Sequence, residues 1–321
     1  MARFLLRRII LGILVLWLVT VGVFLIFYVG PGPGAVPRAL AGREATPQMV
    51  ALVKHRLLLD RPLIVQYGHF LWQLLHGNLG YDFYHGESVN TILKQAFPIS
   101  LSLVLGAAVL WLIIGVLTGV VSAVRSRSVW DRTFTGLALL FYSMPTFVLG
   151  LLLLLIFYYE LTVHGVSAFP GSGYTSFTTS PFEWFRGLIL PWITLALVSA
   201  ATYTRLSRGS MLDVMGEDYI RTARSKGLPE RRVIFRHALR AALTPVVTQF
   251  GIDVGILLGG AIITEQVFGM PGLGFTAVQA IEQQDLPVII GVVIVGTTAM
   301  VIASIVVDAL YAVLDPRVRL H

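Results

Sequence analysis

A single carboxylate inside an apolar stretch is the side chain of this sequence best placed to do chemistry. Asp253 is flanked by Gly251 and Gly255 in an apolar segment that begins at residue 244. At 1.5 Å per helical residue, Asp253 would lie about 14 Å deep in a membrane. A charge at that depth is expensive, so it marks either a pathway for a polar solute or a hydrogen-bonded packing contact with a Thr or Tyr of a neighbouring helix. The sequence leaves both interpretations open.

Histidines are the other candidate ligands. His55, His69, His76 and His85 all fall between residues 30 and 97. They are scattered, and neither a cysteine nor a tight acidic cluster accompanies them, so we expect no metal site. The chain contains no cysteine, which excludes disulfides, thiolate metal sites and cysteine nucleophiles.

The sequence also lacks a nucleotide-binding motif. A P-loop needs Gly-Lys followed by Ser or Thr, and none of the lysines, which are Lys54, Lys94 and Lys226, follows a glycine. We therefore expect a non-catalytic chain that does not hydrolyse ATP by itself. Its net charge is +7, but its basic residues are not interleaved with aromatic residues as they are on nucleic-acid-binding surfaces. We therefore expect no nucleic-acid partner.

A polar stretch at residues 215–243 separates two apolar segments. Nine of the 24 Lys and Arg residues lie between residues 205 and 240. Asp218 is placed to cap a short helix that ends at Gly227, where a residue without Cβ can adopt the left-handed turn. Pro229 suits the first turn of a second helix. The pattern predicts two short helices joined by a tight bend.

Composition indicates that these elements belong to a membrane protein. Of the 321 residues, 56% are hydrophobic and 13% are charged, and the mean hydropathy is +0.79. We expect an all-α polytopic protein in the lipid bilayer, with six transmembrane helices, because six apolar stretches can cross about 30 Å of hydrocarbon. These stretches are residues 9–29, 99–124, 133–159, 188–207, 244–266 and 288–311.

The distribution of positive charge predicts the topology. Seventeen Lys and Arg residues lie at the two ends of the chain, between the second and third spans and in residues 205–240, against seven elsewhere. Cytoplasmic loops carry the excess of Lys and Arg, so both termini should be cytoplasmic. We expect a first transmembrane helix at 1–29, an extracytoplasmic segment at 30–97, a five-helix core at 98–311 that includes the 215–243 loop, and a cytoplasmic tail at 312–321.

The loop at 215–243 resembles the coupling loop of the integral-membrane permease subunits of ATP-binding-cassette (ABC) importers. Ala223 and Gly227 fit that family's Glu-Ala-Ala-x-x-x-Gly pattern, whereas Arg221 and Thr222 stand where Glu and Ala are usual. These departures look like the dipeptide, oligopeptide and nickel permease branch. Residues 61–67, 77–80, 265–274 and 314–319 are also similar to that branch, so the resemblance covers nearly the whole chain.

The resemblance implies the B-type permease subunit of a peptide importer in a bacterial or archaeal cytoplasmic membrane. It implies pairing with a second homologous permease, so that each chain forms half of a translocation pore. Two cytoplasmic ATPases would hold ATP and Mg²⁺, an extracytoplasmic binding protein would deliver the peptide, and this chain would bind no cofactor. Nickel or glutathione as cargo stays open. An ion-coupled secondary transporter, with Asp253 as the carrier, and an intramembrane enzyme are weaker alternatives.

The resemblance also assigns roles to particular residues. The residues that it implies contact the ATPases are Asp218, Tyr219, Arg221, Thr222, Ala223, Arg224, Lys226, Gly227 and Arg232. In the third span Pro145 removes a backbone hydrogen bond and is expected to kink the helix beside Ser143, which favours a pore lining over simple packing. Glycines at intervals of four let another backbone approach the fifth span. The pore candidates are therefore Asp253, Ser143, Pro145, Gly251 and Gly255.

Overall fold

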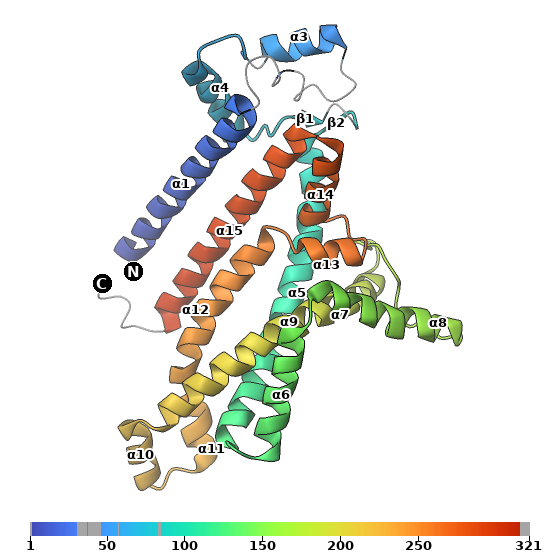
Figure 1. Cartoon of the computed structure of the whole chain (residues 1–321). Helices are drawn as coiled ribbons and strands as arrows, with labels where there is room; N and C mark the ends of the chain where they lie inside the picture. The colour runs from blue at the N-terminus through green and yellow to red at the C-terminus, as the bar shows by residue number, and fades with distance from the viewer. Residues whose placement is uncertain (1, 31–36, 38–45, 57, 83–84, 315–321) are drawn as a thin grey trace. The chain divides into compact units, whose positions relative to one another are not determined.

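The computed structural model describes residues 2–30, 37, 46–56, 58–82 and 85–314, and these are almost entirely helical (Figure 1). The elements are α1 (Ala2–Phe24), the π-helix η1 (Leu25–Val29), α3 (Pro47–Arg56), α4 (Leu63–Leu75), β1 (Tyr81–Asp82), β2 (Glu87–Ser88), α5 (Val89–Val124), α6 (Val129–Ser143), α7 (Thr146–Leu153), the π-helix η2 (Leu154–Glu160), α8 (Leu161–Val163), α9 (Pro181–Met215), α10 (Asp218–Ser225), α11 (Glu230–Arg232), the π-helix η3 (Val233–Ala238), α12 (Leu239–Leu258), α13 (Ile262–Val267), α14 (Leu273–Gln283) and α15 (Leu286–Leu314).

Six helices in the described part of the chain are long and apolar enough to cross a membrane. They are Leu6–Val29, Val89–Val124, Thr146–Val163, Pro181–Met215, Glu230–Leu258 and Leu286–Ala309. The predicted all-α class with six transmembrane helices is therefore confirmed.

The chain forms two compact units. The first comprises residues 1–101, 258–262 and 271–305, and the second comprises residues 102–257, 263–270 and 306–321. In the first unit, Phe24 of α1 and Phe70 of α4 meet in a buried aromatic cluster. The hydroxyl groups of Thr20 and Tyr67 lie 2.9 Å apart in a hydrogen bond, which gives the α1–α4 contact a polar anchor.

Elsewhere in the first unit, the start of α5 packs against α14 and α15. Leu93 of α5, Leu273 of α14 and Val288 of α15 are buried in one cluster. The Leu273 backbone N–H donates to Ser100 Oγ at 2.8 Å. The two-residue strands β1 and β2 pair antiparallel immediately before α5, so the hairpin lies at the beginning of this helix.

In the second unit, glycines bring α5 and α9 into close contact. A Cβ at Gly106 would lie 2.1 Å from Trp192 Cε2, and a Cβ at Gly115 would lie 2.3 Å from Tyr203 Cβ. Neither position has space for a side chain, so the two backbones approach closely, as small residues permit between membrane helices.

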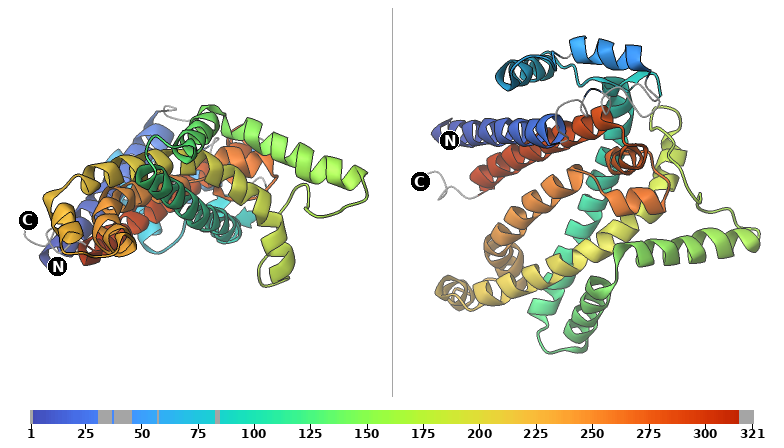
Figure 2. Two further views of the ribbon diagram at one scale, coloured as in Figure 1. Left: turned by 90° about the horizontal axis from the view of Figure 1, so that it is seen from below. Right: turned by 45° about the horizontal axis from the view of Figure 1, so that its top comes forward.

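The third apolar stretch differs from the expected kinked span at 133–159. Helix α6 ends at Ser143 and α7 begins at Thr146, and Figure 2 shows the two helices leaving the break in different directions. Met144 has ψ of 127°, because the residue before a proline is pushed out of the helical region. Pro145 therefore ends one helix and starts another, and only Thr146–Val163 qualifies as a spanning segment.

The fifth span also differs from the expected range of 244–266. The helix runs from Glu230 and ends at Leu258, and the short helix α13 follows after a turn. Gly260 in that turn has φ of +132°, a conformation that strongly favours glycine and therefore interrupts the helix.

Candidate functional site

The predicted bend between two helices is present, and we call residues 216–242 the helical knob. Only the first helix, α10, is short, because the second continues without a break from Glu230 to Leu258. Helix α10 begins at Asp218, and Glu217 occupies the N-cap position without a capping bond from its side chain. The expectation that Asp218 caps the helix is therefore wrong. Its carboxylate instead lies in the first turn, 3.5 Å from Arg221 Nη1, where a negative charge complements the helix dipole.

The bend of the helical knob is a Schellman motif. Gly227 has φ of +73°, its N–H donates to the Arg224 carbonyl at 2.9 Å, and the Leu228 N–H donates to the Ala223 carbonyl at 3.4 Å. Leu228 also packs against the apolar cluster under α10. Pro229 then takes the N-cap position of α11, one residue before the expected first turn. The sequence thus identified the bend correctly, and glycine meets its backbone requirement with the least strain.

One side of the helical knob is a packing surface. Ile220 and Ala223 of α10 are buried against Val120 of α5, Met211 of α9 and Val233 of η3. Ala223, one of the nine residues assigned to contact with ATPases, therefore supports α10 from beneath and exposes little side chain.

The other side of the helical knob is exposed and mainly cationic. Tyr219 is 47% exposed, and the Arg224 guanidinium pairs with the Glu230 carboxylate across the bend at 2.8 Å. The exposed members of the predicted contact set are Asp218, Tyr219, Arg221, Thr222, Arg224, Lys226, Gly227 and Arg232. These residues are exposed on α10, the bend and the start of the helix that follows, and a mainly polar, cationic set of this kind suits docking to another protein better than catalysis.

An ion pair in the same unit was missed by the sequence analysis. Arg208 of α9 donates to both carboxylate oxygens of Asp131 in α6, at 2.7 and 2.9 Å. Asp131 is 5% exposed and also accepts the Arg127 backbone N–H at 2.8 Å. The hydrogen bond from Arg208 is the main reason that the pKa of Asp131 falls to about 2. The pattern Ser128-x-x-Asp131 is typical of a helix start, but no local signal points to Arg208.

Asp253 lies in a small polar cluster. The Tyr203 hydroxyl of α9 donates to Asp253 Oδ2 at 2.9 Å, and Gln249 Nε2 donates to Asp253 Oδ1 at 2.8 Å. Tyr203 is fully buried, and its ring lies beside Trp111 of α5 with centroids 6.1 Å apart. These bonds support the packing interpretation of Asp253, in which a tyrosine of a neighbouring span satisfies the carboxylate.

Comparisons with known proteins identify the family. Residues 115–320 match the model of the binding-protein-dependent transport system inner membrane component, and residues 1–104 match that family's N-terminal membrane component. The chain belongs to this family of transport permeases. It is 39% identical over 319 residues to a putative peptide transport system permease protein of Brucella abortus (strain 2308), with 99% of each chain covered.

Other relatives agree with this assignment. The permease is 36% identical over 338 residues to the dipeptide transport system permease protein DppB of Escherichia coli (strain K12), with 99% of each chain covered. A chain from inward-facing structures of the MetNI methionine ABC transporter has the same fold, with a TM-score of 0.53 and 17% identity over 70% of this chain and 96% of that chain.

The pore candidates of the permease divide into two groups. Gly251 and Asp253 lie in the packed part of α12, where a Cβ at Gly251 would be 2.2 Å from Val307 Cγ1. Gly255 is also buried. Ser143 and Pro145, in contrast, are exposed at the α6–α7 break, and Ser143 Oγ donates to the Leu139 carbonyl at 2.9 Å. The pore role of all five residues stays a prediction.

Proposed function

We propose that this permease is one subunit of a peptide-importing ABC transporter and that it lines half of the translocation pathway. The helical knob is the observation that carries the proposal: a Schellman bend presents an exposed cationic surface at the end of two membrane helices, α9 and α12. Family membership and the peptide and dipeptide permeases among the relatives support the cargo class, which is di- or oligopeptides.

The helical knob docks onto a cytoplasmic ATPase in this proposal. The chain pairs with a second homologous permease and receives peptide from an extracytoplasmic binding protein. ATP and Mg²⁺ bind to two ATPase subunits, because no P-loop occurs in this sequence. The permease lies in a bacterial or archaeal cytoplasmic membrane with both termini inside, as the excess of Lys and Arg on that side predicts.

The absence of cysteine from the chain makes the docking surface testable. A benzophenone maleimide is attached to a single cysteine introduced by Tyr219→Cys or Arg221→Cys, and the assembled transporter is irradiated. Both exposed positions should crosslink to an ATPase. Thr178→Cys is the matched control, because residue 178 is exposed and lies in the loop before α9, on the side predicted to face outward.

The results separate docking from transport. An intact complex that gives no ATPase crosslink from Tyr219→Cys or Arg221→Cys, or an equal crosslink from Thr178→Cys, contradicts the docking surface. The cargo is tested in proteoliposomes with labelled di- and tripeptides, with Ni²⁺ and glutathione as competitors. Uptake of Ni²⁺ or glutathione without uptake of peptide would contradict the peptide assignment and leave the importer architecture intact.

A further inference from the structure

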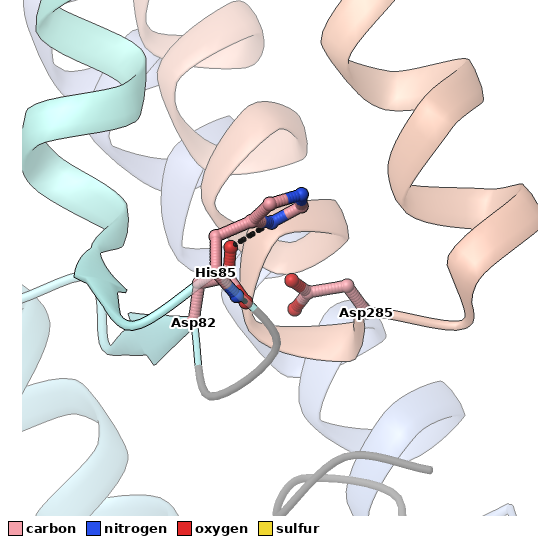
Figure 3. A group of neighbouring side chains, drawn as sticks. All are labelled: Asp82, His85 and Asp285. Carbon is pink, nitrogen blue, oxygen red and sulfur yellow. Dashed lines mark hydrogen bonds and ion pairs between the residues drawn. The ribbon is translucent and has the colours of Figure 1, made fainter. Parts of the chain in front are cut away.

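Three side chains from two distant parts of the sequence lie close together in the first unit, outside the membrane-spanning helices. Figure 3 shows Asp82 and His85 from the β-hairpin region facing Asp285, which precedes α15. One candidate ligand atom from each residue lies within 4.8 Å of the other two. The three residues border a cavity of about 360 Å³, which Glu87, Gln283 and Thr276 also line.

The local structure explains how each side chain reaches this position. The backbone N–H of His85 donates to Asp82 Oδ1 at 3.0 Å, and His85 Nδ1 lies 2.6 Å from Asp82 Oδ2. Asp285 follows Gln284, whose left-handed backbone (φ +59°) ends α14. Its Oδ1 accepts the Val288 N–H at 3.2 Å and so caps α15. The two carboxylates are therefore positioned by separate turns.

This arrangement concentrates negative charge away from water. Asp82 is fully buried and Asp285 is 7% exposed. Asp285 Oδ2 is buried and has no hydrogen-bond partner among the residues that the structure describes. A buried carboxylate oxygen without a donor is costly, and a second carboxylate beside it adds repulsion. A bound cation would compensate all of these costs.

We propose that Asp82, His85 and Asp285 bind a divalent cation of the Zn²⁺ type. Two carboxylate oxygens and one imidazole nitrogen are ligands that zinc and its first-row neighbours accept, and three protein ligands leave a position for water. Tetrahedral ligands at about 2.1 Å from zinc are roughly 3.4 Å apart, so the side chains need only small rotations from their present separations. The exposed side of His85 gives the ion a path from solvent.

The site would pin the β-hairpin to the turn between α14 and α15, joining two ends of the first unit that are far apart in sequence. This inference departs from the expectation that the external histidines bind no metal. Asp82 was close to His85 in the sequence, but only the fold brings in Asp285. The role is structural and does not depend on the cargo that the permease transports.

The full-length chain, assembled with its partners in nanodiscs and stripped with chelating resin, is titrated with Zn²⁺ alone. We expect one high-affinity Zn²⁺ per chain and a higher thermal midpoint, because an ion that binds only the folded state stabilises it. Co²⁺ in place of Zn²⁺ should give visible absorption bands of a low-coordinate site. His85→Ala should weaken Zn²⁺ binding by more than the roughly 10–100-fold that loss of an outer-shell partner costs.

His76→Ala is the matched control, since His76 is exposed on the same external segment and its Nδ1 bonds to the Trp72 carbonyl one turn earlier in the chain. Asp285→Asn should lose the ion as His85→Ala does. If Asp285→Asn fails to fold, His85→Ala decides the test, because the His85 side chain is half exposed and its removal leaves no buried hole. Absence of stoichiometric Zn²⁺ in the parent chain, wild-type affinity in His85→Ala, or equal loss in His76→Ala each overturns the proposal.

Discussion

Replacing Gly227 separates backbone strain from side-chain bulk at the bend of the helical knob. Gly227 has φ of +73°, and a Cβ built there meets nothing within 4 Å. Bulk therefore causes no clash, and only the left-handed backbone resists substitution. Alanine and valine are strained in this conformation, with the β-branched valine worse, whereas asparagine tolerates it.

The expected magnitude follows from the backbone alone. A residue with Cβ in the left-handed region costs about 1–2 kcal/mol, which is a factor of roughly 5–30 in the population of the native bend. Gly227→Asn should retain most of the coupling between ATP hydrolysis and transport. Gly227→Ala should lose about fivefold, and Gly227→Val should approach the upper end of the range.

The assay measures ATP hydrolysis and peptide uptake by the assembled transporter in proteoliposomes, with membrane insertion of each variant checked by its yield. Peptide uptake per ATP hydrolysed should decrease in the order wild type, Gly227→Asn, Gly227→Ala, Gly227→Val. Equal uptake in all four proteins would refute the view that the bend conformation carries coupling. A loss of uptake in Gly227→Asn as large as that in Gly227→Val would show that the result depends on contacts of residue 227 and not on backbone strain.

Four further predictions concern the ion pair, the polar cluster and the topology. Asp131→Asn should lower the unfolding midpoint of the purified chain, because it breaks the pair with Arg208. The pKa of Asp131 is lowered from 3.8 to about 2, so its stabilisation is present above about pH 4 and is lost as pH falls toward 2; this loss should be absent in Asp131→Asn. Tyr203→Phe removes one hydroxyl donor and should destabilise the chain by about 1–3 kcal/mol in denaturant titrations, whereas equal stability would contradict the bond to Asp253. Asp253→Asn keeps an acceptor for Tyr203, so it should assemble normally; if Asp253 lines the pathway, loss of its charge should lower transport, and normal transport would disprove the pathway role. A reporter fused after His321 should be inaccessible from outside intact cells, and external access would reverse the topology.

Features set by neighbouring residues were predicted well from the sequence. The left-handed turn at Gly227 follows from one residue type, and the membrane helices follow from runs of apolar side chains. Pro145 was recognised as a disruption, but its effect was underestimated. A kink requires the backbone to stay helical through Met144, whereas the structure releases Met144 to an extended conformation and starts a new helix.

Features that depend on distant residues were not predictable. Nothing near Asp131 indicates that Arg208 will meet it, and nothing near Gly106 indicates the indole of Trp192. Asp253 shows the same limit. Its position in an apolar segment was visible, but its hydrogen-bond partner Tyr203 lies in another helix, and the pathway role stays a prediction.

The connections of the helical knob determine what its movement can do to the permease. The bend leads into one helix that continues from Glu230 to Leu258, about 43 Å at 1.5 Å per residue, and this helix carries Asp253. The Ser210 hydroxyl of α9 donates to the Ala242 carbonyl at 2.9 Å, which joins α9 to the same helix near the knob. Farther along, the absence of a side chain at Gly251 holds α12 against Val307 of α15. If the knob is displaced, we expect α9 and α12 to move with it as packed helices. The helix from Glu230 to Leu258 has two irregular places where we expect it to bend, the π-helical turn η3 and Pro245. In the proposed transporter, ATP binding by the partner ATPases would then be transmitted to the membrane through α9 and α12. The bend at Gly227 would set the direction in which the knob moves.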